Sequence, residues 1–182
     1  MCQVRNVVLS AALLASTALV LTPQAFAAGA GGSPEDAARF IEQNIGLTSR
    51  PVTLDQLRRR VRPKSESSRD VRNAHIPGQI DKMTVLAGDG IEVEAYVPAR
   101  GPVLVQRIKV TATDSKLPLG LWIGRSALDD MYGALGENAE NAKGPRGEFA
   151  RRYFNPERTA SALLWFGGGE RLTGVEWRFG GD

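Results

Sequence analysis

The stretch Leu121–Phe179 constrains the fold of this chain more than any other part of the sequence. Apolar residues recur at helical spacing within Ser126–Gly136, and serine and glycine are typical boundary residues of a helix. The pattern then changes to the two-residue period of strands, first at Arg151–Phe154 and then in a hairpin at Ser161–Phe179. We therefore expect a helix that precedes antiparallel strands.

Residues 53–112 repeat this order of elements with little identity of sequence. Thr53 begins a helix, and its spacing from Gln56 is that of a capping box. Further on, Ile91–Val97 alternates apolar with polar residues, which predicts a strand with one buried face, and Leu104–Ala112 returns beside it. The order is typical either of two tandem helix–sheet units or of one continuous α+β sheet, and both interpretations stay open.

The remaining segments are arranged around these units. Ser33 followed by proline favours a helix start, and we expect this short helix to stop at Gly46. Two polar stretches, Lys64–Asn73 and Glu137–Gly147, show no apolar period and are predicted to be loops. The expected divisions are a leader at 1–27, a tail and helix at 28–52, a first helix–sheet unit at 53–119 and a second at 120–182, together forming one compact domain.

The first 27 residues have the pattern of a cleaved signal peptide. A short basic start is followed by an apolar run at Val7–Leu21, which is shorter than the roughly 20 residues of a membrane-spanning helix. Ala25-Phe26-Ala27 fits the small-x-small pattern before a cut after Ala27. We expect a periplasmic or secreted protein without a stable membrane anchor.

The composition of the chain after the leader argues against disulfide bonds and against a nucleic-acid partner. The one cysteine, Cys2, lies in the leader, so a hydrophobic core and not disulfides must hold the fold. Of 23 basic residues only Arg5 lies in the leader, which leaves 22 against 20 acidic residues. We interpret the basic runs at 58–62 and 151–152 as solvent-facing and expect no nucleic-acid partner. Binding of anionic lipid headgroups through Arg58–Arg62 is kept as a separate hypothesis.

The chemistry-bearing residues form no recognisable catalytic set. The sole histidine, His75, lies in a loop-like segment, and no serine occurs in a G-x-S-x-G sequence. One histidine without thiols does not make a zinc site, and no calcium-loop pattern is present. We expect no enzyme, metal or cofactor. The alternative is a periplasmic hydrolase or small-ligand-binding domain that uses His75, Asp81 and a serine.

Aromatic and arginine residues of the second unit predict a binding surface. Tyr153 and Trp165 are expected on the sheet face away from the helices, beside Arg151 and Arg178. Aromatic side chains with arginine are typical of interface hot spots. The alternative is a sheet covered on both sides, with these residues in the core, as we expect for Trp177.

The second unit also resembles known exported proteins. The run Gly120-Leu121-Trp122-Ile123-Gly124-Arg125-Ser126 is followed by a set of apolar, glycine and aromatic positions, namely Leu128, Leu135, Gly136, Tyr153, Phe166, Gly169, Leu172 and Val175. This pattern is similar to that of the outer-membrane assembly lipoproteins of the SmpA/OmlA type and of the β-lactamase inhibitor protein. The resemblance implies helices on one face of an antiparallel sheet, with the other face available to a partner. Those lipoproteins carry a cysteine after the signal, and this chain does not.

Together these observations predict an α+β fold, with helices packed on one face of an antiparallel sheet. The expected function is that of an exported, non-enzymatic protein that binds another protein or an envelope component through its sheet face.

Overall fold

A computed structural model describes residues 31–48 and 52–180, which form three α-helices and eight strands. The α-helices are α1 (Pro34–Gln43), α2 (Leu54–Val61) and α3 (Leu128–Leu135). The strands are β1 (Ser65–Arg72), β2 (Ile80–Ala87), β3 (Ile91–Val97), β4 (Leu104–Val110), β5 (Glu140–Lys143), β6 (Phe149–Phe154), β7 (Ala160–Phe166) and β8 (Leu172–Phe179).

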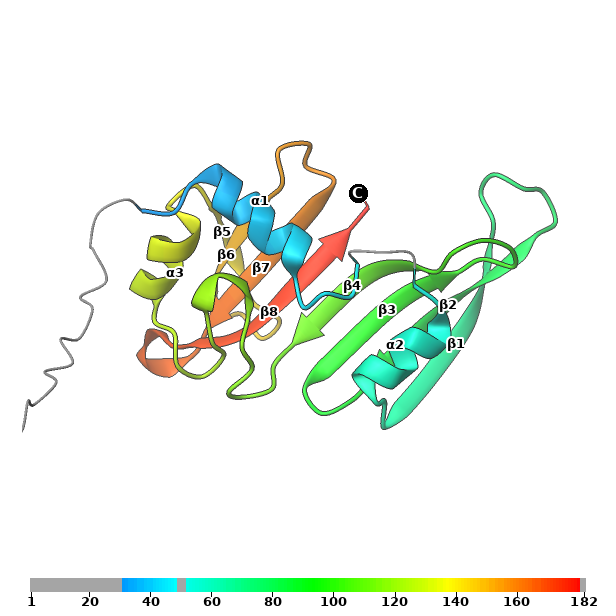
Figure 1. Ribbon diagram of the computed structural model, residues 1–182, viewed down its shortest axis with the longest axis horizontal. Helices are drawn as coiled ribbons and strands as arrows, with labels where there is room; N and C mark the ends of the chain where they lie inside the picture. Colours follow the sequence, from blue (N-terminus) through cyan, green and yellow to red (C-terminus); the bar gives the residue numbers. More distant parts are fainter. Residues whose placement is uncertain (1–30, 49–51, 181–182) are drawn as a thin grey trace, which may run out of the picture.

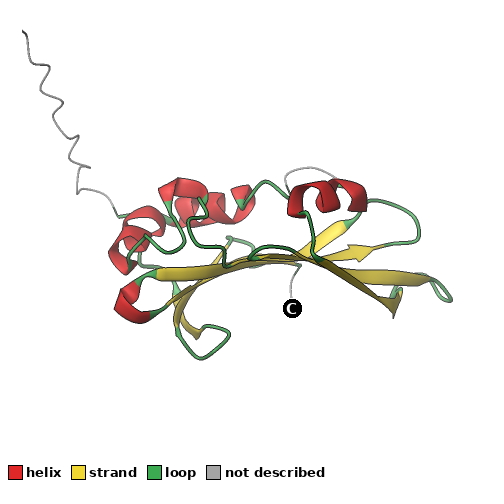
Figure 2. Ribbon diagram, turned by 90° about the horizontal axis from the view of Figure 1, so that it is seen from below, coloured by secondary structure: helices red, strands yellow, loops and turns green. Residues whose placement is uncertain are grey.

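All eight strands belong to one antiparallel sheet in the order β1-β2-β3-β4-β8-β7-β6-β5. The α-helices lie on the same side of this sheet, and within the described ranges no α-helix covers the other side (Figure 2). The predicted α+β class, with helices on one face of an antiparallel sheet, is confirmed. We call the two sides the helix face and the open face.

Each half of the chain contributes a helix followed by four strands, α2 with β1–β4 and α3 with β5–β8. We call these halves the first and the second unit. They join where β4 pairs with β8 through Arg107–Val110 and Val175–Arg178. The strand order is therefore symmetrical about this junction, with β1 and β5 at the two edges (Figure 1). The strands of both units therefore belong to one continuous sheet.

Two of the helices begin as their sequences predict. The hydroxyl of Ser33 accepts a hydrogen bond from the backbone N–H of Asp36 at 3.2 Å, and the Asp36 carboxylate accepts one from the N–H of Ser33 at 3.0 Å. Thr53 and Gln56 make the same reciprocal pair at the start of α2. Both helices therefore have two of their otherwise unpaired N–H groups satisfied by side chains.

The start of α3 differs from the prediction by one residue. Ala127, not Ser126, is the N-cap, and the Asp130 carboxylate accepts a hydrogen bond from its backbone N–H at 2.8 Å. The hydroxyl of Ser126 instead accepts from the N–H of Trp122 at 3.0 Å, which fixes the preceding loop. At the other end, Gly136 ends the helix with a φ of 79°, a conformation that favours glycine.

The loops predicted at 64–73 and 137–147 are wrong in the same way, since each contains an edge strand. Residues 65–72 form β1 and residues 140–143 form β5. Every residue of β1 except Val71 is exposed, and in β5 only Ala142 is partly buried. A strand that is exposed on both faces needs no apolar alternation, so periodicity cannot detect it.

The main core lies between the helices and the sheet, and α1 packs at an unexpected place in it. Although α1 precedes the first unit in the sequence, it contacts α3, β6 and β7 of the second (Figure 1). The ring of Phe40 stacks on that of Trp177 with centroids 5.4 Å apart, and both side chains are fully buried. The second unit is therefore covered by two helices and the first by α2 alone.

The expected signal peptide and its cleavage point lie outside the described residues. Among the helices that the structure does describe, none has the length and apolar character needed to cross a membrane.

Candidate binding face

The register of the strands decides which side chains share a face of the sheet. Directly opposed residues of paired antiparallel strands project to the same side. Buried Trp177 is opposed by Ile108 on β4 and by Ala162 on β7, which places all three on the helix face. Their neighbours Glu176 and Arg178 therefore point to the open face.

Tyr153 was expected on the open face, and this expectation is wrong. It is opposed by Ala162, and only 1% of its surface is exposed. Its hydroxyl donates a hydrogen bond to the carbonyl oxygen of Gly136 at 2.7 Å, so the side chain anchors the end of α3. Burial raises the pKa of this hydroxyl above its ordinary range.

Arg151 lies on the same side as Tyr153, and its expected place on the open face is also wrong. Its guanidinium carbon lies 5.6 Å from the ring centroid of Tyr132 in α3. Its Nη2 donates to the carbonyl oxygen of Glu137 at 3.1 Å, and Nη1 bonds the side chain of Asn141. Arg151 thus ties β6 to α3 and β5 on the helix face. Its sequence neighbour Arg152, which was not among the predicted residues, points to the open face, opposite Leu163.

Trp165 does lie on the open face, but it is only 4% exposed. It packs with Ala150 and Leu163 in a small second cluster. Its indole ring lies directly against the backbone of Gly174, which has no side chain. A Cβ atom built on Gly174 would lie 2.2 Å from Cζ2 of the indole. On the outer side the turn between β5 and β6 covers the ring, where a Cβ on Gly144 would lie 2.8 Å from Cβ of Trp165.

A hollow of about 420 Å³ remains beside the covered Trp165. Its lining is mixed, with charged, hydroxyl and backbone groups from four segments: Lys109, Thr111, Pro145, Arg146, Glu148, Gly167 and Thr173. The Nζ atom of Lys109 lies 6.0 Å from the centroid of the indole. Trp165 therefore forms the floor of a shallow site and does not present a free ring to a partner.

A network of ion pairs crosses the junction of the two units on the open face. Arg107 on β4 contacts Glu92 at 2.6 Å, Glu94 at 3.2 Å and Glu176 at 3.4 Å. Glu176, which is 6% exposed, also accepts from Nε of Arg178 at 2.7 Å. Desolvation lowers the pKa of the Arg107 guanidinium, but the three carboxylates outweigh it and raise the pKa above its ordinary value.

The first unit presents a different surface on the open face. The register aligns a group of apolar side chains from four adjacent strands: Val71, Met83, Val85, Tyr96 and Leu104. Leu104 is 49% exposed, and the others are partly exposed. Met83, Tyr96 and Leu104 are directly opposed in one row, and exposed apolar side chains grouped between charged neighbours are typical of contact surfaces. Sequence reasoning missed it because the residues of β1 were predicted to be a loop and because the grouping depends on the register of four successive strands.

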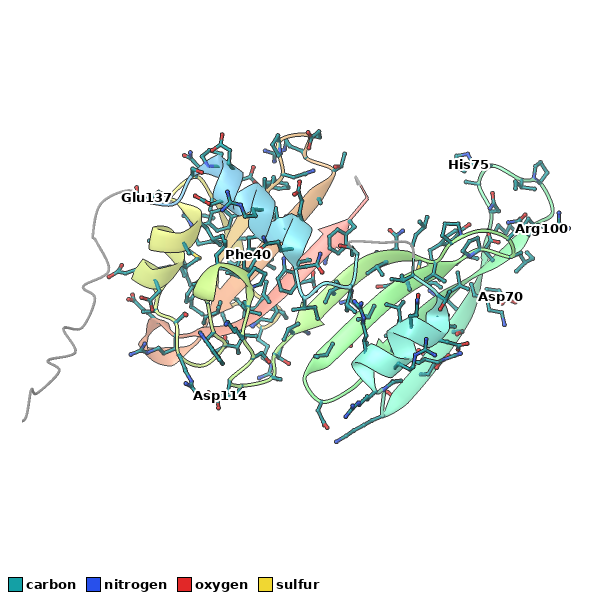
Figure 3. The ribbon with its side chains drawn as sticks, viewed as in Figure 1. Phe40, Asp70, His75, Arg100, Asp114 and Glu137 are labelled. Atoms are coloured by element: carbon teal, nitrogen blue, oxygen red, sulfur yellow. The ribbon has the colours of Figure 1, made fainter. Side chains whose placement is uncertain are left out.

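The residues of the hydrolase alternative are not assembled into a site. His75 is exposed at the tip of the loop between β1 and β2 (Figure 3). Within the described segments its one hydrogen bond runs from its backbone N–H to Oδ1 of Asn73 at 2.8 Å. Asp81 lies on the open face of β2, where β1, β2 and β3 end, and is 1% exposed.

Asp81 has a structural environment rather than a catalytic one. Its carboxylate accepts hydrogen bonds from the Tyr96 hydroxyl, from Nδ2 of Asn73 at 2.7 Å, from Nε2 of Gln79 at 2.8 Å and from the N–H of Ala99 at 2.8 Å. These bonds, that of Tyr96 first, lower the pKa of Asp81 to about 2. A carboxylate with four donors ties two loops together and is a poor proton acceptor.

The basic run 58–62 is largely engaged in contacts within the protein. Arg58 contacts Asp55 at 2.8 Å and Glu66 at 2.6 Å, and Arg60 donates to the carbonyl oxygen of Gly46. Arg62 ends α2 in a left-handed conformation with a φ of 50°. The lipid-headgroup hypothesis for this helix stays a prediction, and among the described residues the side chains of Arg59 and Arg62 make no hydrogen bond or ion pair.

No group of three or more histidine, cysteine, aspartate or glutamate side chains in the described part of the chain is placed to hold a metal ion. Comparison of the chain with protein-family models, with curated proteins and with solved structures finds no match. The resemblance of the second unit to the SmpA/OmlA-type lipoproteins and the β-lactamase inhibitor protein therefore stays a prediction.

Proposed function

We propose that this protein is exported and acts without catalysis, binding another protein or a component of the cell envelope through the open face of its sheet. The observation that carries the proposal is the one-sided cover of the sheet, with α1, α2 and α3 on the helix face only (Figure 2). A sheet face without a second layer must interact with solvent or with another molecule.

The composition of the open face supports the same proposal. The first unit offers the partly exposed group of Met83, Tyr96 and Leu104, and the network around Arg107 adds charges of both signs beside it. Interfaces are enriched in aromatic residues, methionine and arginine, with a polar rim. The chemistry of the face favours docking of a folded partner over binding of a small apolar ligand, because the hollow beside Trp165 is lined largely by charged, hydroxyl and backbone groups.

A photo-crosslinking experiment in the native cell tests the proposal. A photoreactive residue replaces Met83 or Leu104 on the open face, and in matched controls it replaces Arg39 or Asp129, which are exposed on the helix side. We expect a discrete crosslinked product from the open-face positions and none from the controls. Products from the helix-side positions alone, or from no position, would contradict the proposal.

A further inference from the structure

A second hollow, of about 340 Å³, lies on the open face at the outer end of β6, β7 and β8. Its lining contains three arginines and no acidic residue; the lining residues are Arg152, Phe154, Arg158, Thr159, Ala160, Ser161, Arg178 and Gly180. The arginines come from three separate elements, β6, the turn between β6 and β7, and β8. We call this site the arginine hollow.

Two of the arginines are held in place by contacts that leave some of their N–H hydrogen-bond donors free. The guanidinium of Arg158 lies 3.8 Å from the ring centroid of Phe154, and its Nη2 bonds Glu140 at 2.8 Å. Arg178 uses its Nε for the buried Glu176 at 2.7 Å, and its two terminal nitrogens make no hydrogen bond within the described ranges. Fixed guanidinium groups lose less entropy when they bind an anion than mobile ones do.

The third arginine has no charge partner among the residues described. Arg152 is opposed on β5 by Glu140, but the Glu140 carboxylate is bonded to Arg158 instead. The side chain of Arg152 is only partly exposed, so its charge is not fully solvated. An anion bound in the hollow would stabilise an arginine in this position beside two others.

We propose that the arginine hollow binds a phosphate-type oxyanion, either free or as the exposed phosphate group of a larger molecule. A planar carboxylate offers two oxygens, whereas a phosphate offers three or more acceptors in different directions. Three guanidinium groups from three elements, with the hydroxyls of Ser161 and Thr159 in the same lining, suit the tetrahedral anion. This site goes beyond the docking proposed above, because it requires no protein partner.

Calorimetric titration of the intact purified chain with inorganic phosphate tests the proposal, with acetate as the comparison anion. We expect saturable binding of phosphate at one site and much weaker binding of acetate. Arg152→Glu and Arg178→Glu should each weaken phosphate binding by about tenfold or more, since each loses a charge-assisted hydrogen bond. Arg152→Lys keeps the charge but loses the planar guanidinium. Its affinity for phosphate should lie between that of the unchanged protein and that of Arg152→Glu.

The matched control is Arg69→Glu, an exposed open-face arginine on β1 of the first unit. It makes the same change of net charge at a distance from the hollow and should leave phosphate binding unchanged. Equal weakening by Arg69→Glu and Arg152→Glu would show binding by net charge alone and would overturn the proposal. Circular dichroism of each variant verifies that it is folded.

A parallel flotation assay distinguishes the source of the phosphate. Phosphatidylcholine vesicles with and without phosphatidic acid are mixed with the protein and its variants. Binding of free phosphate alone assigns the hollow to a soluble anion, and binding of phosphatidic acid vesicles that Arg152→Glu abolishes assigns it to a headgroup. Binding of neither probe, or equal binding of acetate and phosphate, would overturn the proposal. Both assays use purified protein, so their failure leaves the crosslinking test of the docking face unaffected.

Discussion

The two units have the same order of elements, but they differ in how much covers their strands. In the first unit, α2 alone lies over β2 and β3, and the open face has no cover in the part of the chain described. In the second, α1 and α3 lie over the sheet on the helix face, and the turn at Gly144 covers Trp165 on the open face. The strands of the second unit are accordingly buried along most of β7 and β8.

This difference suggests a division of roles within one continuous sheet. The second unit, together with α1 packed on it, contains the largest buried side chains, including Trp177, Tyr153 and Phe40, and so contributes most of the apolar burial. The strands β1–β4 of the first unit continue the same sheet beyond β8. Their open face has partly exposed apolar side chains. The uncovered face of the first unit is thus stabilised through the neighbouring unit and not by a second layer of its own.

The largest expected effect is loss of the aromatic stack in the second unit. Trp177→Ala should destabilise the protein by about 3–5 kcal/mol, because it removes a fully buried indole and its contact with Phe40. Chemical denaturation followed by circular dichroism measures this free energy. The control Met83→Ala, at a partly exposed position of the first unit, should cost well below half as much. Equal costs would contradict the division of roles.

A smaller effect is expected where Trp165 packs on the sheet. Gly174→Ala places a methyl group against the indole and should destabilise by about 1–3 kcal/mol through overpacking. Gly133→Ala in α3 is the matched control, since its added Cβ meets no atom within 4 Å. That control should stabilise the protein by about 0.5–1 kcal/mol, because alanine favours helix over glycine. Thermal melting of both variants tests whether the open face of the second unit is as tightly packed as described.

The hydrogen bond by which Tyr153 on β6 anchors the end of α3 should contribute still less to the stability of the protein. Tyr153→Phe removes the hydroxyl that donates to Gly136 and leaves its carbonyl oxygen without that partner, at an expected cost of about 1 kcal/mol. Tyr132→Phe is the comparison, because within the described residues its hydroxyl makes no hydrogen bond, and it should be nearly neutral. If both variants have the stability of the unchanged protein, Tyr153 is not an anchor. Urea denaturation with tyrosine-independent detection at 222 nm by circular dichroism is the measurement.

The smallest effect is local and lies at the far end of the first unit. The pKa of Asp81 is lowered to about 2, below the value of about 3.9 in an unfolded chain. Its hydrogen bonds therefore stabilise the loops above pH 4 and are lost as the pH falls through 2. The amide proton resonance of Ala99, which donates to Asp81, should titrate with that low midpoint and should not titrate in Asp81→Asn. A midpoint near 4 would show that the carboxylate is not held as described.

Local signals in the sequence predicted more of the fold than of the binding face. The caps at Ser33 and Thr53 and the alternation at 91–97 depend on residues a few positions apart, and all three are confirmed. The edge strands β1 and β5 were missed because they are exposed on both sides and lack an apolar period.

The candidate face depended on the register of paired strands, which apolar periodicity within one strand does not specify. Trp165 and Arg178 were placed on the correct side, but Tyr153 and Arg151 were not, because the parity of β6 relative to β7 is set by their pairing. A shift of one residue exchanges the two faces of a strand. The docking of α1 on the second unit likewise required the contact of Phe40 with Trp177, which no local pattern indicates.

We propose that the open face of the first unit is occupied in the cell, and the labelling of single cysteines provides a direct test. The sequence has one cysteine, Cys2, in the expected leader, so Val85→Cys on the open face and Asp129→Cys on the helix side each introduce one thiol into the part of the chain that follows the expected cleavage point. The rate of maleimide labelling is compared between intact cell envelopes and the purified protein. We predict that Val85→Cys reacts much more slowly in envelopes than after purification, while Asp129→Cys reacts equally in both. Equal rates for Val85→Cys in the two preparations, or protection of Asp129→Cys instead, would contradict the account.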